Sequence, residues 1–271
     1  MVLSITLAQI ESKIGDVQYN LKKHLMVLDN NDSDFIVFPE LSLTGYILKD
    51  LVFEVHKKAE RAVEEISMSY NKSTIIIGTI HEVRKGIFRN SAAIIIDGKI
   101  NYISKYYLPT YGLFEEKRYF QPGDPKRELR IFNYKNVNFG VIICEDAWHP
   151  EPLEALARLG ADLILIPSAS PIRGLGKIIE IERQWSSLLV AHAIMNTVWI
   201  AFSNMVGNQE EEYFWGGSRI ITPNGIEALI GKKLEEDIIK GNIDLEENKR
   251  ARYFSGFKDH LNVFHEILKD L

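Results

Sequence analysis

Cysteine is nearly absent from this chain of 271 residues, in which Cys144 is the single example. One cysteine excludes an internal disulfide framework and a zinc site built from several thiolates, but it leaves room for one nucleophilic thiol. An excess of positive charge is also absent, because 32 Lys and Arg stand against 37 Asp and Glu for a net charge of −5. With no long block of Lys and Arg, the sequence predicts no nucleic-acid partner.

Long apolar segments and leader-like features are missing as well. The most apolar later stretch, residues 188–202, is interrupted by His192 and Asn196 and does not predict a membrane-spanning helix. The N-terminal residues have no basic start and reach Glu11 too early for a secretory signal. We therefore expect a soluble, cytoplasmic protein with no membrane partner.

Motifs for metals and common cofactors are missing too. The seven histidines show neither a His-x-His nor a His-Glu-x-x-His spacing. Neither a phosphate-binding Gly-x-x-x-x-Gly-Lys-Ser/Thr loop nor a Gly-x-Gly-x-x-Gly turn is present. The sequence therefore predicts that the protein uses no metal and no cofactor.

The composition that remains is that of an ordinary globular protein. Hydrophobic residues make up 46% of the chain and charged residues 25%, which supplies ample material for a core. The length lies within the range that one α/β domain reaches, and no linker-like stretch or internal repeat divides it. We predict one domain over residues 1–271.

Runs rich in Ile and Val alternate with helical patterns along the chain. Most of these runs are continuously apolar, which is typical of strands buried on both faces. Strands are predicted at residues 2–9, 34–38, 74–80, 92–96, 137–143, 162–166 and 197–203. Helices are predicted at residues 17–28, 51–69, 150–159, 175–195 and 260–271. Asp97-Gly98 and Asn224-Gly225 predict hairpins, so the fold class is α/β with mixed sheets.

Three strand-like segments, residues 34–38, the second hairpin arm 99–103 and residues 137–143, are followed by residues that could carry chemistry, namely Glu40, Lys105 and Cys144. If these strands are neighbours with parallel ends, the three side chains meet in one pocket at the edge of the sheet. Glu40 could then deprotonate the thiol, and Lys105 could lower its pKa or stabilise an oxyanion together with the backbone N–H of Glu145. A cysteine at the end of an apolar strand is more often an inert core residue, so spacing alone leaves both interpretations open.

The residue strings around these positions resemble the signature regions of the nitrilase, or carbon–nitrogen hydrolase, superfamily. They are FPELSLTGY from Phe38, KYYLPTYGLFEEKRYFQPG from Lys105 and GVIICEDAW from Gly140. The resemblance implies that Cys144 is the nucleophile, Glu40 the general base and Lys105 the cation that stabilises the tetrahedral intermediate. It places a second catalytic glutamate at Glu116, with Glu115 as a near alternative.

The resemblance also implies a fold, an assembly and a substrate pocket. The family fold is an α-β-β-α sandwich, two mixed β-sheets flanked by helices, whose protomers pair through helices into homodimers or higher homo-oligomers. By that analogy residues 150–159 and 175–195 are the pairing helices. Besides Glu145, the positions implied to bind substrate are Tyr46, Tyr111, Trp148, Ser170 and Arg173. For the aromatic residues, core packing is an equal alternative.

Within the superfamily, the chain most resembles the glutamine-hydrolysing domain of glutamine-dependent NAD synthetases. Those enzymes carry a second, ATP-using domain with a Ser-Gly-Gly-x-Asp-Ser loop, and this sequence contains no such string. We therefore expect either a stand-alone amidase or an ammonia-producing subunit that works with a separate synthetase.

The expected reaction is hydrolysis of a small carboxamide, glutamine-like or an ω-amide, to a carboxylate and ammonia through a cysteine thioester. A nitrilase or an N-carbamoyl amino acid hydrolase would use the same three residues and stays open as an alternative. A non-catalytic scaffold is the alternative of another class, although it would have no chemical need for Glu40, Lys105 and Cys144 together.

Overall fold

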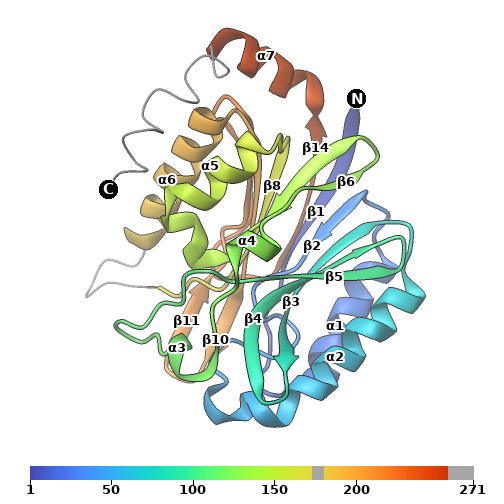
Figure 1. Cartoon of the computed structure of the whole chain (residues 1–271), viewed down its shortest axis with the longest axis vertical. Helices are drawn as coiled ribbons and strands as arrows, with labels where there is room; N and C mark the ends of the chain where they lie inside the picture. The colour runs from blue at the N-terminus through green and yellow to red at the C-terminus, as the bar shows by residue number, and fades with distance from the viewer. Residues whose placement is uncertain (173–179, 256–271) are drawn as a thin grey trace.

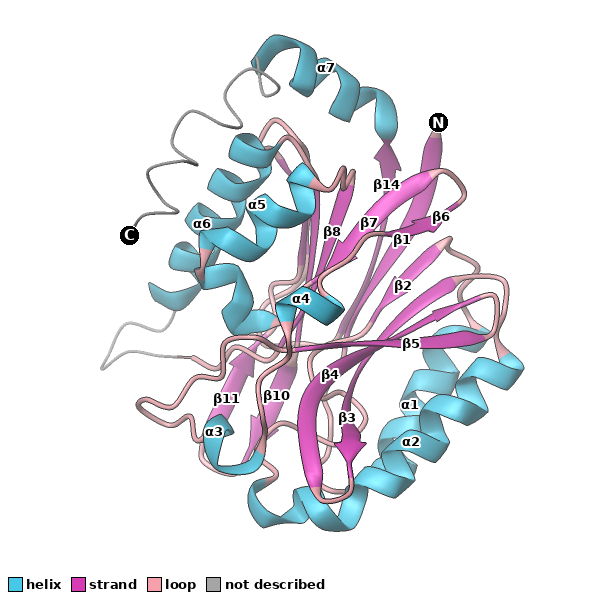
Figure 2. Cartoon of the chain, viewed as in Figure 1, coloured by secondary structure: helices cyan, strands magenta, loops and turns pink. Residues whose placement is uncertain are grey.

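Two mixed β-sheets pack face to face between two layers of helices in the computed structural model, which describes residues 1–172 and 180–255 (Figure 1). The first sheet has the strand order β14-β1-β2-β3-β4-β5, and the second has the order β13-β12-β9-β8-β7-β6. Helices α1 and α2 cover the outer side of the first sheet, and α5 and α6 lie on the side of the second (Figure 2). This arrangement confirms the predicted α-β-β-α sandwich.

The elements have the following bounds. The first sheet consists of β1 (Val2–Gln9), β2 (Phe35–Val37), β3 (Thr74–Arg84), β4 (Ile87–Ile96), β5 (Lys99–Ser104) and β14 (Asp237–Asp244). The second consists of β6 (Phe132–Tyr134), β7 (Val137–Val141), β8 (Leu163–Ser168), β9 (Trp199–Asn204), β12 (Arg219–Ile221) and β13 (Glu227–Ile230). A separate hairpin pairs β10 (Val206–Gln209) with β11 (Glu212–Trp215). The helices are α1 (Val17–Asp29), α2 (Val52–Ser69), α3 (Glu116–Tyr119), α4 (Pro125–Glu128), α5 (Pro150–Arg158), α6 (Glu180–Asn196) and α7 (Leu245–Ser255), with 3₁₀ turns η1 (Lys49–Leu51) and η2 (Cys144–Trp148).

The central strands are apolar throughout because each of their faces lies in a different core. In β2, Phe35 and Val37 belong to the cluster between the two sheets. Ile36, between them, belongs to the cluster under α1 and α2. Since neighbouring side chains of a strand point to opposite faces, both sets must be apolar when both faces are covered.

Most predicted elements are present, with some shifted ends. The strand predicted at 92–96 begins earlier, at Ile87. The backbone of its polar first half pairs antiparallel with β3, as the backbone of its apolar second half does. The strand predicted at 137–143 ends at Val141, before the turn that carries Cys144. The Asp97-Gly98 hairpin is confirmed, with φ of 48° and 72° at its two turn residues, as a two-residue turn between twisted strands requires.

The sequence signal was too weak for several short or exposed elements. Strand β14 lies at the edge of the first sheet and buries only Ile239 and Ile243 of its apolar side chains. Helix α7 buries only Asn248 and Ala251, so it has no apolar stripe that a pattern could reveal. The helix predicted at 260–271 and the start of the one predicted at 175–195 lie outside the described residues.

Candidate active site

Glu40, Lys105 and Cys144 come together from two different sheets. Glu40 follows β2 and Lys105 follows β5 in the first sheet, whereas Cys144 follows β7 in the second. The expectation that their three strands are neighbours in one sheet is therefore wrong. β3 and β4 separate β2 from β5, but β5 runs in the same direction as β2, so both strands end at the same side.

The centre of the cluster is one ammonium group held by two carboxylates. Lys105 Nζ lies 2.6 Å from Glu40 Oε1 and 2.5 Å from Glu116 Oε1. All three side chains are buried. A buried lysine with two anionic partners stays charged, and the neighbouring Glu116 and Glu40 raise the pKa of Lys105 well above its ordinary value although burial opposes this.

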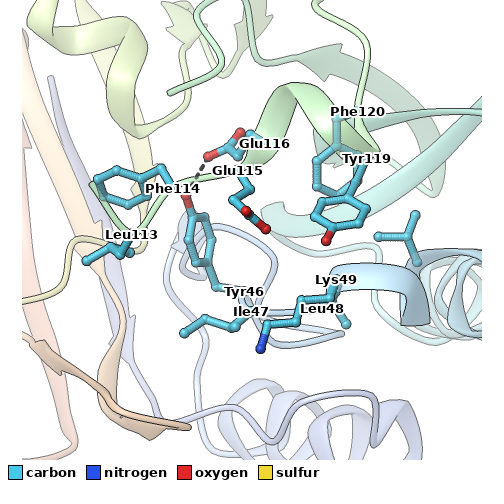
Figure 3. Close-up of a pocket in the computed structure, with 11 residues that line it drawn as sticks. Tyr46, Ile47, Leu48, Lys49, Leu113, Phe114, Glu115, Glu116, Tyr119 and Phe120 are labelled. Atoms are coloured by element: carbon cyan, nitrogen blue, oxygen red, sulfur yellow. Dashed lines mark hydrogen bonds between the residues drawn. The ribbon is translucent and has the colours of Figure 1, made fainter. Parts of the chain in front are cut away.

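Further donors complete the shell around the two carboxylates. Asn90 Nδ2 lies 2.7 Å from Glu40 Oε1 and 3.3 Å from Glu116 Oε2. The backbone N–H of Ala169 donates to Glu40 Oε2 at 2.9 Å. The Tyr46 hydroxyl donates to Glu116 Oε1 at 2.6 Å, a contact that Figure 3 marks with a dashed line. Both carboxylates are therefore fixed in place by hydrogen bonds from several elements.

Cys144 occupies a strained turn at the start of η2. Its φ of 45° lies in the left-handed region, which a side chain with a Cβ adopts only when the surrounding structure enforces it. The side chain is 8% exposed, and the Ser168 hydroxyl donates to its Sγ at 3.2 Å. Strain of this kind at a thiol next to a charged cluster is typical of functional sites.

The thiol form of Cys144 is favoured at rest. Burial and the charge of Glu40 raise the pKa of Cys144 well above its ordinary value, although Lys105 acts in the opposite direction. Lys105 lowers the thiol pKa, as a neighbouring cation should, but burial outweighs this single cation. Deprotonation of this thiol requires a base close by.

Asp146 ties the loop after Lys105 to the turn that carries Cys144. Its Oδ1 accepts the backbone N–H groups of Tyr106 at 2.9 Å and Tyr107 at 2.8 Å. Its Oδ2 accepts the backbone N–H of Ile143 at 3.0 Å. One buried carboxylate thus sets the distance between the chain segments that follow β5 and β7.

The two glutamates of the Glu115-Glu116 pair lie in different surroundings. Glu116 is buried against Lys105. Glu115 is 55% exposed, and the Arg118 guanidinium lies 3.9 Å from its carboxylate. Both line a hollow with Tyr46, Lys49 and Tyr119, in which Figure 3 shows Glu116 beside the Tyr46 hydroxyl. The geometry thus places Glu116 in the cluster and Glu115 outside it.

The residues predicted to bind substrate lie at varied depths. Tyr111 is 49% exposed, and its hydroxyl lies 2.9 Å from each carboxylate oxygen of Glu145. Ser170 is buried, and its hydroxyl accepts a hydrogen bond of 2.9 Å from the Trp185 indole. Trp148 packs edge-on against the same indole. Arg173 lies outside the described residues.

Residues 4–253 match the protein family described as Carbon-nitrogen hydrolase. The chain belongs to this family. A glutamine-dependent NAD(+) synthetase of Thermotoga maritima is 36% identical to it over 259 residues, which is 92% of this chain and 43% of that protein. A glutamine-dependent NAD(+) synthetase of Aquifex aeolicus is also 36% identical, over 257 residues that make up 93% of this chain and 44% of that protein. The chain thus spans less than half the length of these curated relatives.

Solved structures of carbon–nitrogen hydrolases share the fold. The glutamine-dependent NAD+ synthetase of Acinetobacter baumannii, solved with adenosine diphosphate, superposes with a TM-score of 0.83 at 30% identity. The match covers 92% of this chain and 47% of that one. The carbon-nitrogen hydrolase of Helicobacter pylori G27 superposes with a TM-score of 0.88 over 99% of both chains, at 20% identity. The second likeness shows the fold alone.

Sequence reasoning missed three polar residues in the cluster of this hydrolase, namely Asn90, Ser168 and Asp146. Asn90 interrupts a strand whose later residues are continuously apolar, and a buried amide at such a place is a signal that could have been used. Asp146 stands in the string from Gly140, and Ser168 stands two residues before Ser170, but neither position indicates its contacts, because those contacts reach other elements.

Within residues 1–172 and 180–255, no group of three or more His, Cys, Asp or Glu side chains could hold a metal ion. Among these residues no helix is long and apolar enough to cross a membrane.

Proposed function

We propose that this carbon–nitrogen hydrolase cleaves a small carboxamide of the glutamine or ω-amide type to a carboxylate and ammonia. The observation that carries the proposal is the buried ammonium of Lys105 between Glu40 and Glu116, with the thiol of Cys144 beside the cluster. A base, a fixed cation and a thiol at one place are the parts that acyl transfer needs. In this proposal Glu40, Lys105, Glu116 and Cys144 are the catalytic residues.

The first half of the reaction forms a thioester. Glu40 takes the proton of the Cys144 thiol, and Sγ attacks the amide carbonyl carbon. The oxyanion is stabilised by Lys105 and by the backbone N–H of Glu145. When the tetrahedral intermediate collapses, the proton on Glu40 passes to the nitrogen and ammonia leaves.

The second half regenerates the thiol. Glu40 takes a proton from a water molecule, whose oxygen attacks the thioester carbonyl carbon. The oxyanion again faces Lys105, the carbon–sulfur bond breaks, and the proton returns to Cys144 Sγ. Glu116 stays at 2.5 Å from Lys105 throughout and keeps the ammonium aimed at the oxyanion position.

The carboxylate of Glu145, next to Cys144 in the chain, favours a substrate with an ammonium group. Glu145 follows the nucleophile directly, and its carboxylate contacts the exposed Tyr111 hydroxyl. A carboxylate at this place could accept hydrogen bonds from the α-ammonium of glutamine, which simple aliphatic amides and nitriles lack. The names of the relatives, glutamine-dependent NAD(+) synthetases, agree with glutamine as the substrate.

A second candidate follows from the names of those relatives, which are synthetases that depend on glutamine. The chain matches 43% and 44% of their lengths, so the synthetase activity in their names is not assigned to this chain. In this candidate function, the chain supplies ammonia to a separate synthetase and acts as a homo-oligomer or in complex with that partner.

Ammonia release from a panel of substrates tests the proposal. The panel contains glutamine, short aliphatic amides, N-carbamoyl amino acids and nitriles, with Cys144→Ala as the blank. We expect turnover of glutamine or another ω-amide that is lost in the blank. Glu145→Gln is the matched variant for substrate choice, and we expect it to raise KM for glutamine while leaving aliphatic amides unchanged.

Two results would contradict the proposal. Release from nitriles or carbamoyl compounds alone would replace the amide substrate by one of those classes. No release from any substrate, combined with alkylation of Cys144 by iodoacetamide no faster than that of an ordinary buried thiol, would favour the non-catalytic scaffold.

A further inference from the structure

Asn90 lies between the two glutamates of the cluster, in the middle of β4. Its Nδ2 is 2.7 Å from Glu40 Oε1 and 3.3 Å from Glu116 Oε2, and its backbone carbonyl accepts the N–H of Lys105 at 2.9 Å. The residue is 1% exposed. It is therefore joined to each of the three charged residues of the proposed active site.

The chemistry of its partners fixes the orientation of the Asn90 amide. The ionised carboxylate of Glu40 only accepts hydrogen bonds, so the NH₂ group must be the end of the amide that faces the two glutamates. The amide oxygen then points away, and among the described residues it is buried with no hydrogen-bond partner. A buried acceptor without a partner is unfavourable, and the two carboxylates are what hold the amide in this orientation.

The contacts of the two glutamates are unequal. Glu40 accepts from Lys105, from Asn90 at the short distance, and from the Ala169 N–H, so both its oxygens are occupied. Glu116 accepts from Lys105 and Tyr46 through one oxygen, and its other oxygen has only the long contact to Asn90. Hydrogen bonds to a carboxylate favour its charged form, and they favour it more for Glu40 than for Glu116.

The cluster also carries more negative than positive charge. Within residues 1–172 and 180–255, one ammonium faces two carboxylates, and other titratable groups near them are the phenol of Tyr46, the thiol of Cys144 and the carboxylate of Asp146. In a buried site one of the two carboxylates then tends to hold a proton. Burial and the charge of Glu40 raise the pKa of Glu116 to about 7, although Lys105 opposes them.

We propose that Asn90 is a positioning residue that gives the two glutamates different protonation states. Its amide holds Glu40 as the carboxylate that accepts the proton of Cys144, and it leaves the shared proton on Glu116. This inference rests on the proposed function, because it assigns Glu40 the part of the base in that reaction.

The pH profile of Asn90→Ala tests the inference. Without the amide, Glu40 keeps its contacts with Lys105 and the Ala169 N–H but loses one of its three hydrogen bonds, so we expect the acid limb of kcat/KM to move to higher pH by about one unit. We expect the same movement in the pH dependence of Cys144 alkylation by iodoacetamide, which needs no substrate. Asn90→Ser keeps one donor in a smaller side chain, and its acid limb is expected between those of Asn90→Ala and the wild type.

Asn248→Ala is the matched control. Asn248 is also a buried amide with two donated bonds and an unpartnered oxygen, but it contacts the carbonyls of Asp162 and Thr197 before β8 and β9. Both variants remove a buried side-chain amide. Asn90→Ala removes it in the cluster, and Asn248→Ala removes it at the ends of β8 and β9 where these strands begin. We expect Asn248→Ala to lower thermal stability without moving either pH profile.

The inference is overturned if the profiles of Asn90→Ala coincide with those of the wild type. Should Asn90→Ala fail to fold, unchanged profiles of Asn90→Ser overturn it in its place. Glu40→Gln separates this failure from failure of the proposed function. If Glu40→Gln is inactive while the Asn90 profiles are unchanged, only the role of Asn90 is wrong, whereas an active Glu40→Gln contradicts the proposed function itself.

Discussion

At the scale of single residues, the cluster depends on the ammonium of Lys105. Two glutamates occupy one buried place together because this one cation contacts both. The same contacts orient the cation, so its position needs no adjustment when an oxyanion forms. In the proposed reaction this fixed charge supplies transition-state stabilisation that a mobile surface lysine would not.

Substitution of Lys105 should therefore reduce turnover strongly even at a low pH at which the variant is still folded. We expect Lys105→Ala to lower kcat by ~10²–10³, the usual effect of removing one oxyanion donor. The measurement is ammonia release at a pH at which a thermal melt shows the variant folded. Lys49→Ala is the control, because Lys49 pairs with Glu210 on the surface, where such pairs contribute little. Retention of more than about a tenth of wild-type turnover would remove Lys105 from the proposed mechanism.

At the scale of elements, the site depends on how closely β3 passes the turn that carries Glu40. A Cβ at Gly78 would lie 2.2 Å from the Leu41 nitrogen, 2.2 Å from the Pro39 carbonyl oxygen and 2.6 Å from the Glu40 carbonyl carbon. These are backbone atoms, which cannot turn aside as the end of a side chain can. Only glycine lets the strand support the turn at this distance.

Gly78→Ala should displace Glu40 and reduce activity as well as stability. We expect a loss of turnover of at least tenfold, because a misplacement of about 1 Å in a catalytic group can cost 10² in rate. Gly86→Ala is the control in the same hairpin. Its φ of 76° is unfavourable for alanine, but its Cβ would meet no atom within 4 Å. Gly86→Ala should lower the melting temperature only, and equal activity losses in both variants would refute the explanation by close approach.

At the scale of the whole molecule, the site lies at the junction of the two packed sheets and shares their burial. Both glutamates and the lysine are nearly inaccessible. Burial raises the pKa of Glu116 from 4.5 to about 7, so between these values the folded protein holds a proton that the unfolded chain has lost. The contribution of Glu116 to the free energy of unfolding therefore falls as the pH rises from 4.5 to 7. Above pH 7 the ionised Glu116 destabilises the fold by a constant amount.

Removal of this titration should flatten the stability profile. We expect wild-type protein to lose stability relative to Glu116→Gln between pH 4.5 and 7 by on the order of 3 kcal/mol, from 1.36 kcal/mol for each unit of pKa. Urea denaturation of both proteins at pH 5 and pH 8 measures the difference. Asp146, whose pKa burial also raises to about 7, acts equally in both proteins and cancels. Parallel profiles would show that Glu116 does not titrate in this range.

The sequence predicted the layers of the fold better than the surroundings of the site. The continuously apolar runs of β2, β3 and β8 revealed strands with two covered faces, because burial leaves a direct trace in composition. The hydrogen bonds of Asn90 and Asp146 leave no such trace, because their partners are 26 to 50 residues away for Asn90 and mostly about 40 away for Asp146.

The sequence by itself determined the α/β class and the apolar strands, since local pattern and residue type carry that information, and its resemblance to the nitrilase superfamily pointed to Glu40, Lys105 and Cys144. Only the tertiary structure decided that Cys144 comes from the second sheet, that Glu116 rather than Glu115 contacts Lys105, and that the resting thiol is protonated. The reason is physical. Distances across two packed sheets and the net effect of burial against charge depend on the whole packed arrangement, which no short segment of the chain contains.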